Sequence, residues 1–119
     1  MNRLQHFLRA KTQFNLHSPF VYGLYTEVLF SRAPGRGHNF EDVVWRLERH
    51  YGVSARCQED TASIHTSEAD ILVLDHPHRD EPRWQSLIDD PRYQVTIDLF
   101  TVGIAVVNPH LSKQHFVLR

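Results

Sequence analysis

Two apolar segments near the C-terminus constrain the fold of this chain more than any other feature. Val95–Phe100 and Gly103–Val107 are short, rich in β-branched residues and almost contiguous. This pattern predicts two strands that pair as an antiparallel hairpin, with a tight bend at Gly103. The segment that follows, Ser112–Arg119, predicts a further short strand or an extended arm.

The middle of the chain contains one strong strand signal. Ala69–Asp75 carries four consecutive aliphatic residues, which is typical of a strand that is buried on both faces. Val53–Gln58 predicts a weaker strand, and the polar segment Thr61–Glu68 predicts a loop. Apolar residues at helical spacing predict a helix over Glu81–Asp89. This order of elements favours an α/β domain with a largely parallel sheet.

The first half of the chain has a helical pattern. Arg3–Ala10 predicts a short amphipathic helix, and a second helix is expected to start at Ser18 and Pro19, which suit the cap and the first position. A third helix is expected after Asn39, a good cap, and to stop at Gly52. We therefore expect one domain over residues 1–119, with a helical segment at 1–52 and an α/β part at 53–119.

Composition limits the class of partner. The chain has 119 residues, of which 41% are hydrophobic and 23% charged, with a formal net charge of -1. That balance predicts a globular domain that binds neither nucleic acid nor a membrane. Without a signal-peptide core, an apolar span or a second cysteine, a cytoplasmic location is expected. Cys57, Trp45 and Trp84 are all expected to be buried.

Three segments are informative when taken together: Lys11–Tyr22, which includes the sequence His-Ser-Pro-Phe-Val-Tyr, the strand ending at Asp75 with the helix around Trp84, and Val95–Arg119. In this order they resemble a group of class I S-adenosylmethionine-dependent methyltransferases. The resemblance implies a reduced Rossmann-like sheet of about four to five strands. It also implies a strand order, which runs Val53–Gln58, Ile71–Asp75, Gly103–Val107, Val95–Phe100, with the third strand antiparallel to its neighbours.

The sequence departs from this family at the cofactor loop. Such enzymes bind the cofactor at a glycine-rich turn between a strand and a helix. The only Gly-x-Gly here, Gly35 to Gly37, follows a predicted helix. About 17 residues separate Gly52 from Ala69, whereas one βαβ unit needs roughly 30 residues. We therefore expect no bound cofactor, or S-adenosylmethionine only if a partner chain completes the enzyme.

The best candidate site follows the predicted strand that ends at Asp75. His76, His78 and Asp80 come next, and open α/β sheets bind ligands at such strand ends. These side chains could form a ligand or substrate pocket, and His76 with His78 could bind a divalent metal. The alternative is a turn shaped by Pro77 with exposed histidines around it. No catalytic residue is identified.

Three functions are consistent with these patterns. The favoured hypothesis is a methyltransferase-like remnant without catalytic activity that acts as a binding or assembly module, with a homodimer or another protein as partner. A remnant sheet leaves an edge near Val53–Gln58, and proteins usually cover or pair such edges. The alternatives are an S-adenosylmethionine-dependent methyltransferase and a metal-binding protein that uses His76 and His78.

Overall fold

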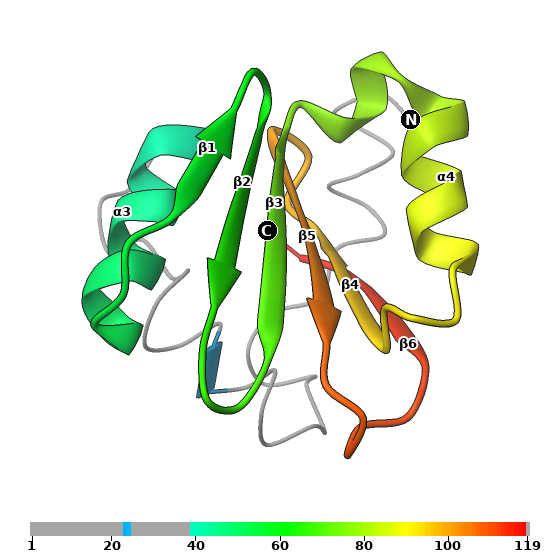
Figure 1. The fold of residues 1–119 in the computed structure, drawn as a ribbon. Helices are drawn as coiled ribbons and strands as arrows, with labels where there is room; N and C mark the ends of the chain where they lie inside the picture. Colours follow the sequence, from blue (N-terminus) through cyan, green and yellow to red (C-terminus); the bar gives the residue numbers. More distant parts are fainter. Residues whose placement is uncertain (1–22, 25–38, 119) are drawn as a thin grey trace.

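The computed structural model describes residues 23–24 and 39–118, and within them the chain forms an α/β fold with a mixed sheet between two helices (Figure 1). The elements are α3 (Phe40–Tyr51), β1 (Arg56–Gln58), β2 (Thr61–His65), β3 (Asp70–Asp75), the 3-10 turn η3 (Pro77–Arg79), α4 (Glu81–Asp89), β4 (Val95–Asp98), β5 (Val102–Val107) and β6 (Gln114–Val117). Lys11–Tyr22 and Gly35 to Gly37 lie outside the described residues.

Within the described residues the sheet has six strands, in the order β1-β2-β3-β5-β4-β6. Strands β3, β5 and β4 lie side by side as expected, and β5 is antiparallel to both neighbours. The expectation of a largely parallel sheet was wrong, because only β4 and β6 pair in parallel. The number of strands also exceeds the four to five expected, since β2 and β6 both join the sheet.

Strand β2 was predicted as part of a loop and instead separates β1 from β3. A turn at Glu59 and Asp60 reverses the chain after β1, and Glu59 has a positive φ of 50°. Within β2, Ala62 and Ile64 are fully buried while their neighbours are more exposed. This alternation is the period of a strand that is buried on one face. The hairpin therefore places β2, rather than β1, beside β3.

The bend between β4 and β5 lies earlier than predicted. The chain turns at Phe100, which has a positive φ of 70°, whereas Gly103 lies inside β5. A Cβ at Gly103 would come within 2.9 Å of the Trp84 ring and 3.0 Å of Pro77. Glycine at this position therefore allows α4 to approach the sheet, and does not form the turn.

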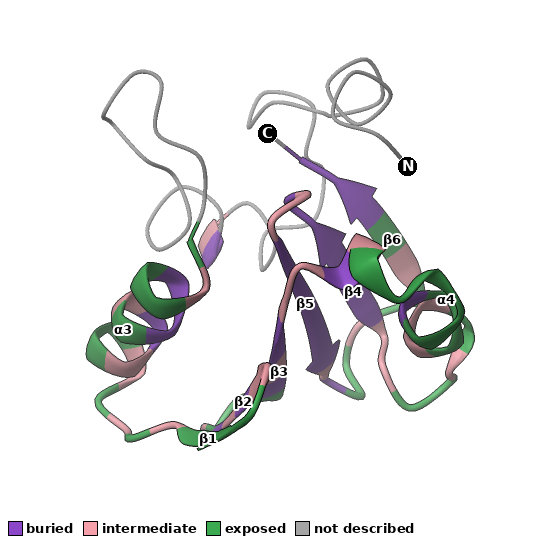
Figure 2. Ribbon diagram, turned by 90° about the horizontal axis from the view of Figure 1, so that it is seen from above, coloured by how far each residue is buried: buried purple, intermediate pink, exposed green. Residues whose placement is uncertain are grey.

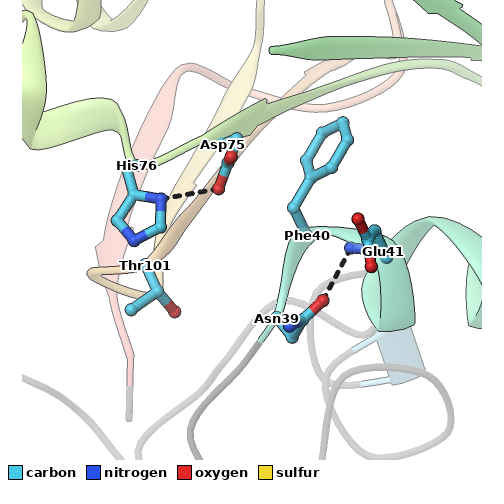
Figure 3. Close-up of a pocket in the computed structure, with 6 residues that line it drawn as sticks. All are labelled: Asn39, Phe40, Glu41, Asp75, His76 and Thr101. Carbon is cyan, nitrogen blue, oxygen red and sulfur yellow. Dashed lines mark hydrogen bonds and ion pairs between the residues drawn. The ribbon is translucent and has the colours of Figure 1, made fainter.

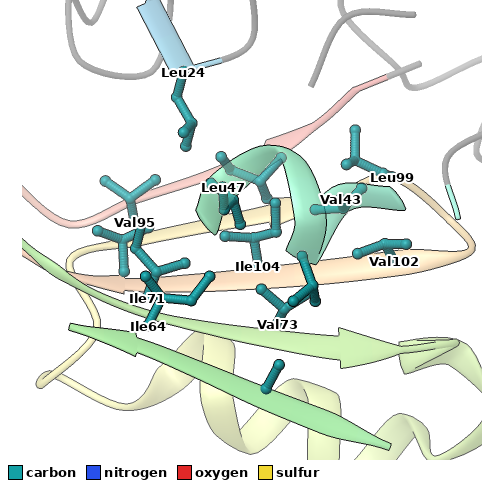
Figure 4. Close-up of a cluster of buried hydrophobic side chains, with 14 of the residues drawn as sticks. Leu24, Val43, Leu47, Ile64, Ile71, Val73, Val95, Leu99, Val102 and Ile104 are labelled. Atoms are coloured by element: carbon teal, nitrogen blue, oxygen red, sulfur yellow. The ribbon is translucent and has the colours of Figure 1, made fainter. Parts of the chain in front are cut away.

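The two helices cover opposite faces of the sheet (Figure 2). Helix α3 packs against β2 and β3, and α4 packs against β4 and β5. The larger apolar cluster lies on the α3 side, where Val43 and Leu47 meet side chains from five strands (Figure 4). The strand residues of this cluster are Ala62, Ile64, Ile71, Val73, Val95, Ile97, Val102, Ile104, Val106 and Phe116.

Helix α3 begins and ends where its capping residues predict. The Asn39 side chain accepts hydrogen bonds from the backbone N–H groups of Glu41 and Asp42, at 2.9 and 3.3 Å. Gly52 takes the left-handed conformation with φ 68° and donates its N–H to the Glu48 carbonyl. These bonds satisfy groups that have no partner within the helix.

Two of the three residues expected in the core are exposed. Trp84 is buried, with 2% of its surface exposed, but Trp45 is 55% exposed on α3 under the Arg49 guanidinium. Cys57 is exposed on β1, which lies at the edge of the sheet among the described strands. Within the described residues, neither helix combines the length and the apolar character needed to cross a membrane.

Candidate functional site

The carboxyl ends of β3 and β4 bring two aspartates to the same end of the sheet. Asp75 ends β3 opposite Val102, and Asp98 ends β4 opposite Gly103. Successive residues of a strand point to opposite faces. The two carboxylates therefore lie on opposite sides of the sheet, Asp75 toward α3 and Asp98 toward α4.

On the α3 side, Asp75 forms a pair with the histidine that follows it. Asp75 Oδ1 lies 2.6 Å from His76 Nδ1. His76 takes a left-handed conformation with φ 49°, which is uncommon for a residue other than glycine. Its backbone N–H donates to the Thr101 carbonyl at 2.9 Å, and the Asp75 N–H donates to the Asp60 carbonyl at 2.8 Å. Two neighbouring turns therefore hold this pair in place.

The pair faces a pocket of about 280 Å³ between the sheet and the start of α3 (Figure 3). Asp75, His76 and Thr101 form the sheet side, and the first turn of α3 forms the other side. The residues of that turn are Asn39, Phe40 and Glu41. The volume is close to the lower end of the range for sites that bind small molecules.

On the α4 side, His78 is held between two carboxylates. Its Nε2 lies 2.6 Å from Asp98 Oδ2, and its Nδ1 lies 2.8 Å from Glu81 Oε1. The His78 side chain is 11% exposed and that of Asp98 only 1%. Carboxylates accept hydrogen bonds when ionised, so this geometry fits an imidazolium ring that donates from both nitrogens.

Asp98 also shapes the turn between β4 and β5. Asp98 Oδ1 accepts the backbone N–H of Phe100 at 2.8 Å, and the Phe100 ring stacks on His78 with 5.6 Å between centroids. Thr101, which lines the pocket, comes next in this turn. His78 and Asp98 therefore support one wall of the pocket from the opposite face of the sheet.

The four residues predicted as a site do not share one pocket. Asp75 and His76 line the cavity, whereas His78 binds Asp98 and Glu81. Asp80 caps α4 by accepting the Arg83 N–H at 3.1 Å. Among the described residues, no group of three or more His, Cys, Asp and Glu side chains is arranged to hold a metal ion.

An ion pair joins the start of α4 to the turn beside the pair of Asp75 and His76. Arg83 Nη1 lies 2.9 Å from Asp60 Oδ2, with the two side chains 41% and 48% exposed. The hydrogen bond from Arg83 lowers the pKa of Asp60, and burial opposes this only in part. The same bond raises the pKa of Arg83. Because Asp60 also accepts the Asp75 N–H, this ion pair supports the pocket from outside.

Sequence reasoning missed the α3 side of the pocket and the partner of His78. Phe40 and Glu41 follow the cap residue Asn39, and nothing in the local sequence shows that this turn lies opposite Asp75. Asp98 did carry a signal, because it is a charged residue within an apolar strand. A buried carboxylate needs a partner, and a histidine is a suitable one.

The chain was compared with known families, proteins and structures. No protein-family model matches its sequence, and no curated protein or solved structure shows a significant similarity to it.

Proposed function

We propose that this chain is a methyltransferase-like remnant that acts as a small-ligand-binding module and transfers no methyl group. The observation that carries this proposal is the pocket at the carboxyl end of β3, where the Asp75–His76 pair faces the first turn of α3. A backbone conformation as uncommon as that of His76 occurs more often at functional sites than elsewhere.

The sheet supports the proposed ancestry. The order β3-β5-β4, with β5 antiparallel between the other two, is the order that the resemblance implies for the C-terminal part of the family's sheet. The antiparallel β2 departs from the family, because it occupies the place beside β3 that a parallel strand should take.

Ligand binding can be tested by two titrations. A set of small fragments of mixed charge, followed by ¹⁵N-labelled NMR, should yield at least one with saturable shifts clustered at Glu41, His76 and Thr101. Calorimetry with S-adenosylmethionine and its demethylated product should show no binding up to about 1 mM. The proposal is overturned if no fragment perturbs these three residues, or if S-adenosylmethionine binds and its methyl group is transferred.

The edge strand β1 supports a second role in assembly. Among the described strands β1 pairs with β2 alone, and its residues Arg56, Cys57 and Gln58 are all exposed. An open strand edge can pair with a second copy of the same strand. Light scattering at micromolar concentration should then give the mass of a dimer, and a Cys57→Pro variant should give the mass of a monomer, because proline removes a backbone donor. A monomeric parent protein would refute this role.

A further inference from the structure

We propose that the pocket between Asp75 and the start of α3 selects a small organic cation, a primary ammonium group carried on an aromatic or aliphatic body. This inference rests on the proposed ligand-binding function and names the ligand class.

The described lining residues carry a net negative charge whichever way His76 is protonated. Among them, Asp75 and Glu41 are the two carboxylates and His76 is the one basic side chain. A neutral His76 leaves two negative charges facing the cavity. A protonated His76 balances Asp75, to which it is bound at 2.6 Å, and still leaves the charge of Glu41. The described part of the lining therefore favours a cation in both states.

The lining also matches the hydrogen-bonding pattern of an ammonium group. The carboxylate of Glu41 has no hydrogen bond or ion pair to any residue in the described part, and Asp75 uses Oδ1 but not Oδ2. An ammonium group has three donors and no acceptor, so a carboxylate oxygen that makes no other bond is a suitable partner for it. The half-buried Phe40 side chain lies on the same wall as Glu41 (Figure 3). Its ring can contact an apolar body or the cation itself.

The start of α3 does not favour an anion, although helix N-termini often do. The side chain of Asn39 already accepts hydrogen bonds from the N–H groups of Glu41 and Asp42, which an anion would otherwise use. These two residues also carry negative charges of their own in the first turn. An anionic ligand would displace the cap and approach two carboxylates, so this wall disfavours it.

Three probes of matched size and different charge test the inference. Benzylammonium is cationic, benzyl alcohol neutral and benzoate anionic, and each is titrated into the ¹⁵N-labelled full chain at pH 7. We expect benzylammonium to give saturable shifts at Glu41, His76 and Thr101, with an affinity at least about tenfold higher than that of the other two probes. Benzoate or benzyl alcohol binding equally well would overturn the inference.

Two variants test whether the carboxylates that line the pocket attract the cation. Glu41→Gln and Asp75→Asn should each weaken benzylammonium binding at least about fivefold, because each removes one nearby negative charge. Asp42→Asn is the matched control, since Asp42 is the next acid in the same helical turn but does not line the pocket. Equal weakening by Asp42→Asn and Glu41→Gln would refute a pocket-specific role. Binding of other fragments at these residues while all three probes fail would overturn the inference and leave the proposed function standing.

Discussion

His78 Nε2 lies 2.6 Å from Asp98 Oδ2, which links the turn before α4 to the end of β4 across 20 residues of sequence. The pair is almost fully buried, and Asp98 also holds the turn at Phe100. The pair of His78 and Asp98 therefore joins the turn before α4 to the β4–β5 hairpin, whose turn forms one wall of the pocket.

Removing the imidazole should destabilise the chain strongly. His78→Ala leaves the Asp98 carboxylate buried without this partner, and breaking a buried pair in this way costs about 3 kcal/mol. Urea unfolding of the variant measures this loss. His65→Ala is the control, because its pair with Asp70 has side chains 71% and 55% exposed, and such pairs contribute less than about 1 kcal/mol. Similar losses in the two variants would contradict the structural role of His78.

Gly103→Ala should destabilise the fold by overpacking. The new Cβ would lie 2.9 Å from two atoms of the Trp84 ring, and forced repacking of this kind costs about 1–3 kcal/mol. A second substitution, Trp84→Phe, makes room, so the double variant should lose less than the sum of the single variants.

Gly52→Ala is the control for the double-mutant cycle of Gly103→Ala with Trp84→Phe. Gly52 has φ 68° and no neighbouring atom near its missing Cβ, so its substitution costs backbone strain alone, about 1–2 kcal/mol. Its effect should add to that of Trp84→Phe. Additive losses for Gly103→Ala with Trp84→Phe would show that the close approach to the ring is not the cause.

The ion pair of Asp60 with Arg83 should contribute stability that disappears in acid. The pKa of Asp60 is lowered in the folded state, chiefly by the hydrogen bond from Arg83. A lowered pKa means that the folded chain binds protons less readily than the unfolded chain. The contribution is therefore present above about pH 4, the ordinary value for Asp, and is lost as the pH falls through the folded value.

The contribution is measured as the difference in unfolding free energy between the parent chain and the Asp60→Asn variant. Both side chains are exposed by more than a third, so solvent screening limits the difference in unfolding free energy at pH 7 to less than about 1 kcal/mol. The difference should shrink in urea titrations between pH 5 and pH 3 and also at high salt. A difference that stays constant across this pH range would argue against the ion pair as its source.

The exposed thiol of Cys57 should react in the native protein. Cys57 lies on edge strand β1, outside the apolar core. A thiol reagent such as Ellman's should therefore modify one thiol per chain without denaturant, at nearly the rate measured for the urea-unfolded chain. Strong protection that persists in the most dilute samples would contradict the exposed position of β1.

Local patterns determined the elements whose signals lie within one segment. Asn39 and Gly52 bound α3 as predicted, because each cap acts on backbone groups a few residues away. Helix α4 matches its predicted range, and β3 and β5 follow their aliphatic runs. The strand β2 was missed because it is short, and its two buried residues, Ala62 and Ile64, are separated by polar ones.

The tertiary structure alone decided which of these elements meet. No local pattern shows that β2 pairs with β3, that α3 brings Glu41 opposite Asp75, or that His78 finds Asp98. These contacts join residues far apart in the sequence, and they form only when the strand register and the packing of the helices bury the apolar faces together. The sequence by itself therefore determined helices α3 and α4, the C-terminal strands and the candidate histidines. Long-range packing decided which of those histidines lines the pocket and which one supports it.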